Sequence, residues 1–323
     1  MNVEEIPGKL REGLDALRLG ISDLRTQLLA RRVLIELRDD GLRGVVLGPK
    51  GLTLELPLPQ GACRDGVPLE REAIGDLIGD QFLELGLAGA RVGVCLPTLA
   101  SSWKVVRWPH ARMPENGRAE LRLRAADLGM PWPLAEIYLE VEPLPGEPPR
   151  SLVVAAPQAV VDGWAEVFEL AGLQLQRLLT PQLCEWSLLT GREADLETGL
   201  EQWLLNLEAG RSRLWVVSEG VPVADWELPA QHPDRAQPPD RGLDPALLAE
   251  LERCRRFWEQ HSSRGVPAPQ QWFLYGDDRI VASAEAGLRR MLPEGSLQRW
   301  RPAAADATLG LRLSGLKLCM GWT

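Results

Sequence analysis

The sequence has few of the residues from which metal centres and disulfide frameworks are built. Its three histidines are scattered and form no H-E-x-x-H pair, and its five cysteines are widely spaced and contain no C-x-x-C motif. These absences argue against a zinc site and against a disulfide framework. With 323 residues, 45% of them hydrophobic, the chain has enough apolar material to build a core without such cross-links.

Excess positive charge is also lacking. Asp and Glu together number 45 against 36 Lys and Arg, which gives a formal net charge of −9 and argues against nucleic acid as a partner. No run approaches the roughly 18 apolar residues of a membrane span, and the first residues lack the apolar core of a signal peptide. We therefore expect a cytoplasmic protein that reaches a membrane only through a partner or an amphipathic surface.

The first 32 residues have the pattern of an amphipathic helix. Leucine and isoleucine recur alternately every four and three residues from Leu10 to Leu28, which is an a/d heptad seam interleaved with charges of both signs. Such a seam fits self-association or pairing with another protein. It fits packing on the chain's own domain equally well.

Two groups of short strands follow, each with alternating or continuous apolar residues around polar turns. The predicted strands are 33–37, 44–47 and 52–56 in the first group and 203–207, 213–217 and 222–228 in the second. Between them, the order strand 151–156, helix 159–171 and strand 173–179 predicts an α/β unit. Two halves that each open with a β-meander are typical of the actin-like, or ribonuclease H-like, two-lobed α/β fold.

An ordered series of motifs makes the resemblance more specific. The chain resembles the PilM proteins, cytoplasmic actin-like components of the type IV pilus inner-membrane platform that are related to FtsA. The runs that carry this resemblance are 94–97 (VCLP), 104–109 (KVVRWP), 131–137 (PWPLAEI), 151–157 (SLVVAAP) and 171–173 (AGL).

The resemblance implies a domain organisation. After the helix at 1–32, the first actin-like lobe would comprise 33–69 and 145–200, with a PilM-type subdomain at 70–144 inserted in it. The second lobe would comprise 201–302, and the segment 303–323 would return to the first lobe. Compared with the family, the helical subdomain of the second lobe would be largely missing, because 226–229 passes straight into a proline-rich loop.

The first phosphate-binding turn of the family departs from its pattern here. The family has a run like I-D-I-G-S-S-S-V-K, and residues 35–43 read IELRDDGLR. Glu36 replaces the aspartate, Arg38 the glycine, and Asp39 and Asp40 stand at hydroxyl positions; Arg43 completes the run. Small residues are needed where backbone N–H groups approach a phosphate, and fixed negative charges repel it.

The second turn and the adenosine motif depart as well. In the second turn, which is like V-D-I-G-A-x-S-T-S-L, Asn206 replaces the catalytic-type aspartate and Glu208 a glycine, with Ser212 at a hydroxyl position. Asparagine cannot act as a general base. The adenosine motif, like L-x-G-G-x-A, keeps Gly276 but has Asp277 as its second glycine. We therefore predict no catalytic residue, no metal and no cofactor, with ATP and Mg²⁺ disfavoured: a pseudo-ATPase.

The resemblance also implies a partner. PilM-type proteins bind the cytoplasmic tail of PilN, a single-span membrane protein, so a PilN-like protein is the expected partner and would hold this chain at the inner face of the cytoplasmic membrane. Other pilus motor or platform components are further candidate partners. Trp103, Arg107 and Trp132 lie in the matching subdomain and are candidate partner-binding residues, although packing roles fit each of them too. Two alternatives remain open: an active actin-like ATPase, and a cytoplasmic platform component of a type II secretion system.

Overall fold

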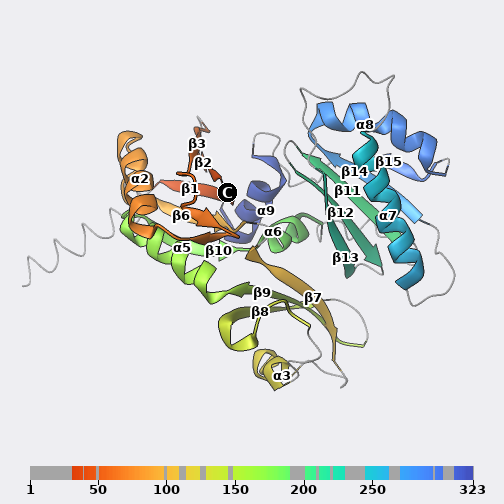
Figure 1. Cartoon of the computed structure of the whole chain (residues 1–323), viewed down its shortest axis with the longest axis horizontal. Coiled ribbons are helices and arrows are strands. Elements are labelled where there is room, and N and C mark those ends of the chain that lie inside the picture. Colours follow the sequence, from red (N-terminus) through yellow and green to blue (C-terminus); the bar gives the residue numbers. More distant parts are fainter. Residues whose placement is uncertain are drawn as a thin grey trace, which may run out of the picture. The chain divides into compact units, whose positions relative to one another are not determined.

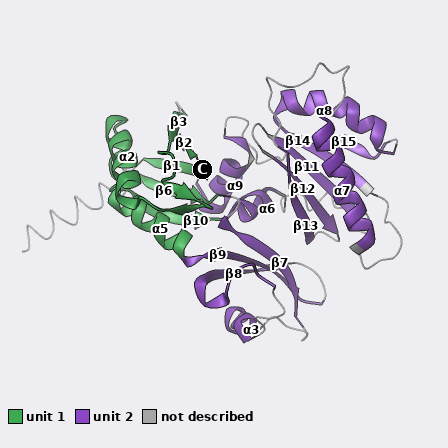
Figure 2. Cartoon of the chain, in the orientation of Figure 1, with its two compact units in different colours: residues 1–97, 159–179 green, residues 98–158, 180–323 purple. Residues whose placement is uncertain are grey.

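The computed structural model describes residues 31–38, 40–48, 51–97, 100–108, 114–123, 129–144, 148–189, 201–208, 211–218, 221–229, 244–261, 270–293, 295–300 and 309–322. The chain divides into two compact units, one of residues 1–97 and 159–179 and the other of residues 98–158 and 180–323 (Figure 2). The predicted helix at 1–32 lies outside the described residues except at its end, where Arg32 opens the first strand.

Unit 1 is built on a five-stranded sheet with the order β10-β6-β1-β2-β3 (Figure 1). Strands β1 to β3 form an antiparallel meander, and β6 and β10 run parallel to β1. Strand β1 is buried over 33–37 and apolar there except for Glu36, as expected for a central strand, whereas β3 alternates between buried and exposed residues at the edge. The strands are β1 (Arg32–Arg38), β2 (Gly41–Val46), β3 (Thr53–Pro57), β6 (Arg91–Cys95) and β10 (Gln174–Leu179).

Two helices, α2 (Arg71–Glu84) and α5 (Gln158–Leu170), lie side by side in unit 1 (Figure 1). They approach closely because α2 has a glycine at the contact: a Cβ on Gly75 would lie 2.7 Å from the Leu170 Cβ. A short hairpin of β4 (Cys63–Arg64) and β5 (Val67–Pro68) is tied to α5 by the Trp164 indole, which donates to the Gly66 carbonyl at 2.8 Å. Helix α2 buries Ile74, Ile78 and Phe82.

Unit 2 contains a second five-stranded sheet whose order, β13-β12-β11-β14-β15, repeats the plan of the first. Strands β11 to β13 form an antiparallel meander, and β14 and β15 are parallel additions beside β11. Both predicted meanders are therefore confirmed. The strands are β11 (Glu201–Glu208), β12 (Arg211–Ser218), β13 (Val221–Leu228), β14 (Gln270–Gly276) and β15 (Leu297–Arg299).

A smaller antiparallel sheet in unit 2 has the order β7-β9-β8, with β7 (Ser102–Arg107), β9 (Arg150–Pro157) and β8 (Ile137–Leu144). Short helices α3 (Gly117–Leu123) and η3 (Leu134–Glu136) accompany it. One apolar cluster contains Val106, Trp108 and Leu121. Another joins residues of this sheet, such as Leu152 and Val154, to one face of the five-stranded sheet.

The remaining helices of unit 2 are α6 (Pro181–Leu189), α7 (Pro245–His261), α8 (Asp278–Met291) and α9 (Gly310–Met320). Helices α7 and α8 pack on the face of the five-stranded sheet that buries Trp203, Leu205 and Trp272. Helix α9, in the segment predicted to return to the first lobe, packs on α6. Residues 230–243, which would join β13 to α7 in place of a helical subdomain, lie outside the described residues.

The observed strand pairing changes two predictions, one domain boundary and one strand assignment. Strand β6 is hydrogen-bonded to β1 in the first sheet. Unit 1 therefore extends to residue 97 and includes the start of the range 70–144 that the sequence predicts to be an inserted subdomain. Strand β9 pairs with β7 and β8 and not with β10, so the predicted α/β unit over 151–179 is wrong. The physical reason is that β9 is the central strand of its own sheet, and a strand buried on both faces looks the same in sequence in either setting.

Candidate functional site

The first predicted phosphate turn lies on the β1–β2 hairpin of unit 1. Glu36 is 2% exposed and stands opposite Arg43 in the antiparallel register, while Arg38, at the end of β1, stands opposite Gly41. Asp40 is exposed in the turn, and Asp39 lies outside the described residues. The glycine at the turn has a structural role, because a Cβ on Gly41 would lie 2.7 Å from the Leu56 carbonyl oxygen of β3.

The second predicted turn lies on the β11–β12 hairpin of unit 2. Asn206 is 1% exposed and stands between Arg213 of β12 and Tyr275 of β14; no described residue donates a hydrogen bond to its Oδ1. Ser212 is also buried, opposite Leu207, and Glu208 ends β11. A buried neutral amide beside an arginine offers neither a general base nor a carboxylate for Mg²⁺.

The adenosine motif lies where β14 passes into α8. Gly276 has φ 126°, and a Cβ there would lie 2.2 Å from the Leu207 carbonyl oxygen, so this position needs glycine. Asp277 is the N-cap of α8: its Oδ1 accepts from the backbone N–H groups of Arg279 at 2.8 Å and Ile280 at 3.2 Å. A carboxylate thus already holds the N–H groups that an anionic ligand would need at this helix terminus.

We expect replacement of Asp277 by alanine to lower the free energy of unfolding by about 1 kcal/mol, because two N–H groups of α8 would lose their acceptor. The measurement is urea unfolding followed by tryptophan fluorescence. Asp277→Asn, which keeps an acceptor oxygen, serves as the matched control and should stay near the wild type. Equal losses in both variants would show that the acceptor oxygen is not what stabilises this helix end, and no loss in Asp277→Ala would show that the cap contributes nothing.

Next to Asn206 in the register, Arg213 belongs to a buried ionic cluster. Its guanidinium hydrogen-bonds to Asp225 of β13, and its Nε lies 3.8 Å from Glu185 of α6. Glu185 also accepts from Arg312 Nε of α9 at 2.9 Å and from the Trp215 indole at 3.0 Å. Two guanidiniums and two carboxylates are therefore held together by strands and helices from distant parts of unit 2.

The two carboxyls of this cluster are shifted in opposite directions. Burial alone would raise the pKa of Glu185, but the charges of Arg213 and Arg312 and the hydrogen bonds from Trp215 and Arg312 lower it below its ordinary value. Burial raises the pKa of Asp225, which has one guanidinium beside it instead of two. Of the two carboxyls, Glu185 is therefore the one whose ionised form the cluster stabilises more strongly.

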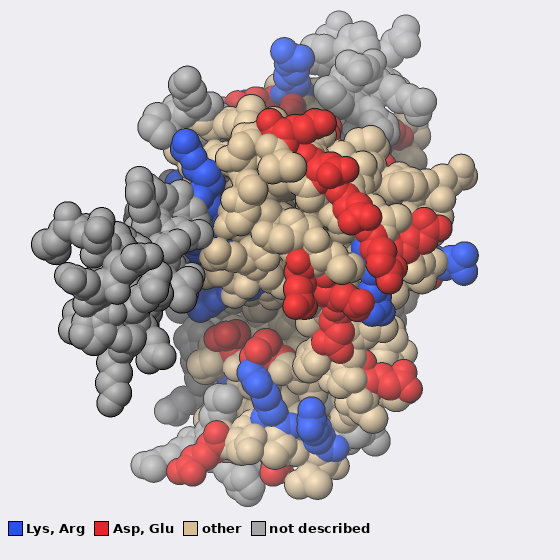
Figure 3. All heavy atoms as spheres, turned by 90° about the vertical axis from the view of Figure 1, so that its left-hand side faces the viewer, with Lys and Arg blue, Asp and Glu red and all other residues tan. Residues whose placement is uncertain are grey.

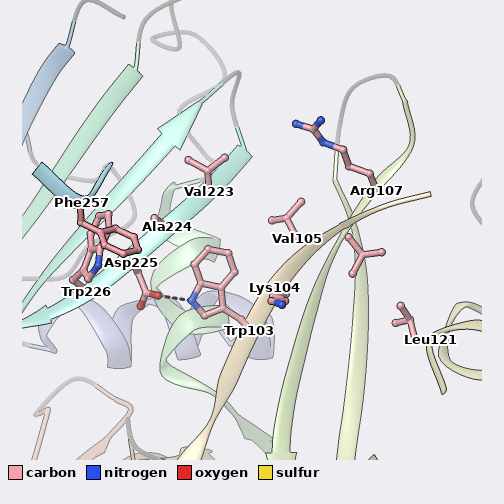
Figure 4. A pocket seen from close by; sticks show the side chains of 11 residues that line it. Trp103, Lys104, Val105, Arg107, Leu121, Val223, Ala224, Asp225, Trp226 and Phe257 are labelled. Carbon is pink, nitrogen blue, oxygen red and sulfur yellow. Dashed lines mark hydrogen bonds between the residues drawn. The ribbon is translucent and has the colours of Figure 1, made fainter. Parts of the chain in front are cut away.

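A groove of about 740 Å³ lies in unit 2 beside this cluster (Figure 4). One wall is strand β7, from Trp103 to Arg107, and the other is β13, from Val223 to Trp226, together with Phe257 of α7. At one end the Trp103 indole donates to Asp225 Oδ1 at 2.7 Å, and Trp103 also stacks on Trp215 with ring centroids 5.3 Å apart. The ionic cluster thus fixes the side chain that closes the groove.

Two of the three predicted partner-binding residues line this groove. Trp103 and Arg107 do, whereas Trp132 packs, partly buried, against the apolar cluster around Trp108 and does not reach it. The sequence analysis missed Lys104, Asp225 and Phe257. Lys104 had a detectable signal, as one of few lysines and the neighbour of a predicted site residue, but nothing local marks Asp225 as the partner of a tryptophan 122 residues away.

Neither a metal site nor a membrane span emerges from the described ranges. In them, no three side chains of His, Cys, Asp or Glu are grouped to hold an ion. No helix within these ranges has the length and apolar content needed to cross a bilayer.

Sequence comparison finds no matching protein-family model and no similar curated protein. Comparison of structures does find similar folds. A chain of the PilM–PilN type IV pilus biogenesis complex matches with 22% identity and a TM-score of 0.63, over 89% of this chain and 98% of that one. A Bacteroides thetaiotaomicron protein with the actin-like ATPase fold matches with 10% identity and a TM-score of 0.48, over 90% of this chain and 97% of that one.

The cytoplasmic domain of EpsL, an inner-membrane component of the Vibrio cholerae type II secretion system, matches with 9% identity and a TM-score of 0.47, over 90% of this chain and 95% of that domain. The PilM–PilN match has the highest TM-score of these three and extends over nearly all of the matched chain. The fold predicted from the sequence is thereby confirmed: the chain has the actin-like fold, and it resembles the PilM–PilN structure in particular.

Proposed function

We propose that this chain is a non-catalytic scaffold of a type IV pilus platform that binds the cytoplasmic tail of a PilN-like membrane protein. The main support is the state of the nucleotide positions. Asn206 stands buried where the resemblance implies a catalytic aspartate, and Asp277 already caps the helix that an anion would approach. A chain that keeps the actin-like fold without the groups for phosphate chemistry is expected to act by binding other proteins.

The partner is inferred from the solved structure that the chain resembles, which is a complex of PilM with PilN. Surface charge supports attachment through such a partner rather than directly to lipid. The exposed face formed by α2 and α5 carries a band of acids (Figure 3), which anionic headgroups repel. The acids are Glu72, Asp76, Asp80 and Glu84 on α2 and Asp162, Glu166 and Glu169 on α5.

We expect the purified chain to show no competable binding of a fluorescent ATP analogue with Mg²⁺, even when plain ATP is added at millimolar concentration. The physical reason is that fixed acids and a self-capped helix occupy the positions where backbone N–H groups would hold phosphate. Competable binding at micromolar nucleotide would instead support the active ATPase. The nucleotide would then become the natural switch for partner binding.

A second arm tests the scaffold itself with a synthetic peptide of the cytoplasmic tail of the PilN-like protein from the same organism. Binding is measured by isothermal titration for the wild type and for Asn206→Ala. Equal affinities are expected, because Asn206 has no catalytic duty in a scaffold. Absence of tail binding by the folded wild type would refute the proposed partner, whatever the nucleotide result.

A further inference from the structure

The groove between β7 and β13 is bounded by two sheet edges. Each strand is hydrogen-bonded on one side, β7 to β9 and β13 to β12, and neither has a second strand partner among the described residues. The lining contains consecutive residues of both strands, so the strand edges themselves face the groove. From the Trp103–Asp225 hydrogen bond the two strands diverge towards Arg107 and Val223 (Figure 4). The groove is therefore a wedge that is open at the Arg107 end.

Strand β7 is the edge better suited to accept another strand. It keeps an unbroken register with β9 over Ser102–Arg107 and contains neither proline nor a bulge. Strand β13 carries both of these edge-protecting features, since Pro222 lies in it and its register with β12 shifts beside Val223. Every second residue of β7 directs its N–H and C=O away from β9, which is the template for strand addition.

The charge of the groove selects among strands. Lys104 and Arg107 are both exposed, and no described residue pairs with either of them. Asp225, the one acid among the described residues of the lining, is already paired with Arg213. A lysine on an edge also guards it against unwanted pairing. Here Lys104 and Arg107 repel basic strands and attract acidic ones, although the whole chain carries a net charge of −9.

Apolar side chains provide the second requirement. Val223 is 37% exposed and Phe257 50% exposed, and both face the groove, with Val105 and Trp226 partly buried beside them. Side chains of an added strand point alternately to its two faces. Lys104 and Arg107 are three residues apart in β7, so their side chains point to opposite faces of the strand. A docked segment with two acids three residues apart would therefore place one acid beside each cation and an apolar residue between them against this wall.

Other occupants fit less well. A cytoplasmic tail next to a membrane span is enriched in lysine and arginine, which the groove cations repel. Nucleic acid is bound through long basic stripes, and the lining offers two unpaired cations among apolar side chains. We propose that the β7–β13 groove binds an extended segment of a second partner protein, with two acidic residues three positions apart among apolar residues, by strand addition to β7. This inference goes beyond the proposed tail binding and makes the chain an adaptor between two partners.

The test is selection from a display library of short random peptides on the purified full chain. The selected peptides should be enriched in pairs of Asp or Glu three positions apart. The tightest peptide is then synthesised, and its affinity should fall about tenfold for Lys104→Glu/Arg107→Glu, because two exposed ion pairs become two repulsions. The affinity should also fall as salt is raised.

The matched control is Arg122→Glu/Arg290→Glu, which changes the net charge equally at exposed sites outside the groove. Its affinity should stay within about twofold of wild type. No enrichment, enrichment without acids, or equal losses in both double variants would overturn the proposal.

Strand addition has its own readout on the wild-type protein. The same peptide is made with N-methyl groups on its odd or on its even backbone amides. Only one of the two sets points at β7, so only one should abolish binding. Equal effects of both sets would overturn strand addition. Titration with the tail peptide separates this proposal from the proposed function, because Lys104→Glu/Arg107→Glu should leave binding of the tail intact. Loss of groove-peptide binding therefore does not refute tail binding, and loss of tail binding does not refute the groove.

Discussion

Replacement of Arg213 by alanine is expected to lower the free energy of unfolding of unit 2 by about 3 kcal/mol or more. Asp225 would lose its guanidinium partner and keep only the Trp103 indole, while fully buried Glu185 would keep only one of its two cations. Breaking a buried ion pair by removing one member costs about 3–5 kcal/mol, because the remaining charge stays desolvated and uncompensated. Urea unfolding followed by tryptophan fluorescence provides the measurement.

The control for this prediction is an arginine–carboxylate pair at the surface. Arg289 pairs with Glu285 on α8 at 2.7 Å, with half of the arginine side chain exposed. Arg289→Ala should therefore cost about 1 kcal/mol or less. If Arg213→Ala costs no more than Arg289→Ala, the buried cluster does not hold unit 2 together as inferred. Because Asp225 fixes Trp103, Arg213→Ala should also weaken binding of the selected groove peptide.

Local patterns were enough to predict most of the elements. The largely apolar run of β1 and the alternation in β3 mark a central and an edge strand, and the same logic located β11 to β13. Three-residue β15 was missed, since a strand so short has no periodicity to detect. The prediction of the sheet to which β9 belongs was wrong, because strand pairing is decided by tertiary contacts that the sequence of a buried strand does not reveal.

The candidate site was less predictable than the fold. The departures at Glu36, Asn206 and Asp277 follow from comparing short runs with a family pattern, and each is a local fact. The groove is not local, because its walls come from strands more than 100 residues apart in sequence. Arg213 illustrates the same limit: its position opposite Asn206 follows from a hairpin, but its contact with Glu185 depends on how α6 packs on the sheet.

The contact between α6 and α9 leads to the second large effect, at Gly315. A Cβ at this position of α9 would lie 1.8 Å from the carbonyl oxygen of Cys184 and 2.5 Å from its carbonyl carbon, so the two helix backbones touch through the glycine. The Ser187 hydroxyl, which donates to the Cys184 carbonyl at 2.8 Å, lies in the same contact. Gly315→Ala should lower the free energy of unfolding by about 3 kcal/mol or more, because backbone atoms cannot move aside as a side chain can.

Helix propensity makes this test sharp, since alanine is favoured over glycine within a helix by about 1 kcal/mol. Any loss in Gly315→Ala therefore comes from the clash. Gly79→Ala on α2 is the matched control. A Cβ on Gly79 would lie 3.4 Å from its nearest neighbours, the backbone atoms of Ala171, so this substitution should leave the free energy of unfolding unchanged or raise it. Separating α9 from α6 would also pull Arg312 away from Glu185. The double variant Gly315→Ala/Arg213→Ala should then lose less unfolding free energy than the sum of the losses in the two single variants. Full additivity in the double variant would mean that the close helix contact and the ionic cluster stabilise unit 2 independently.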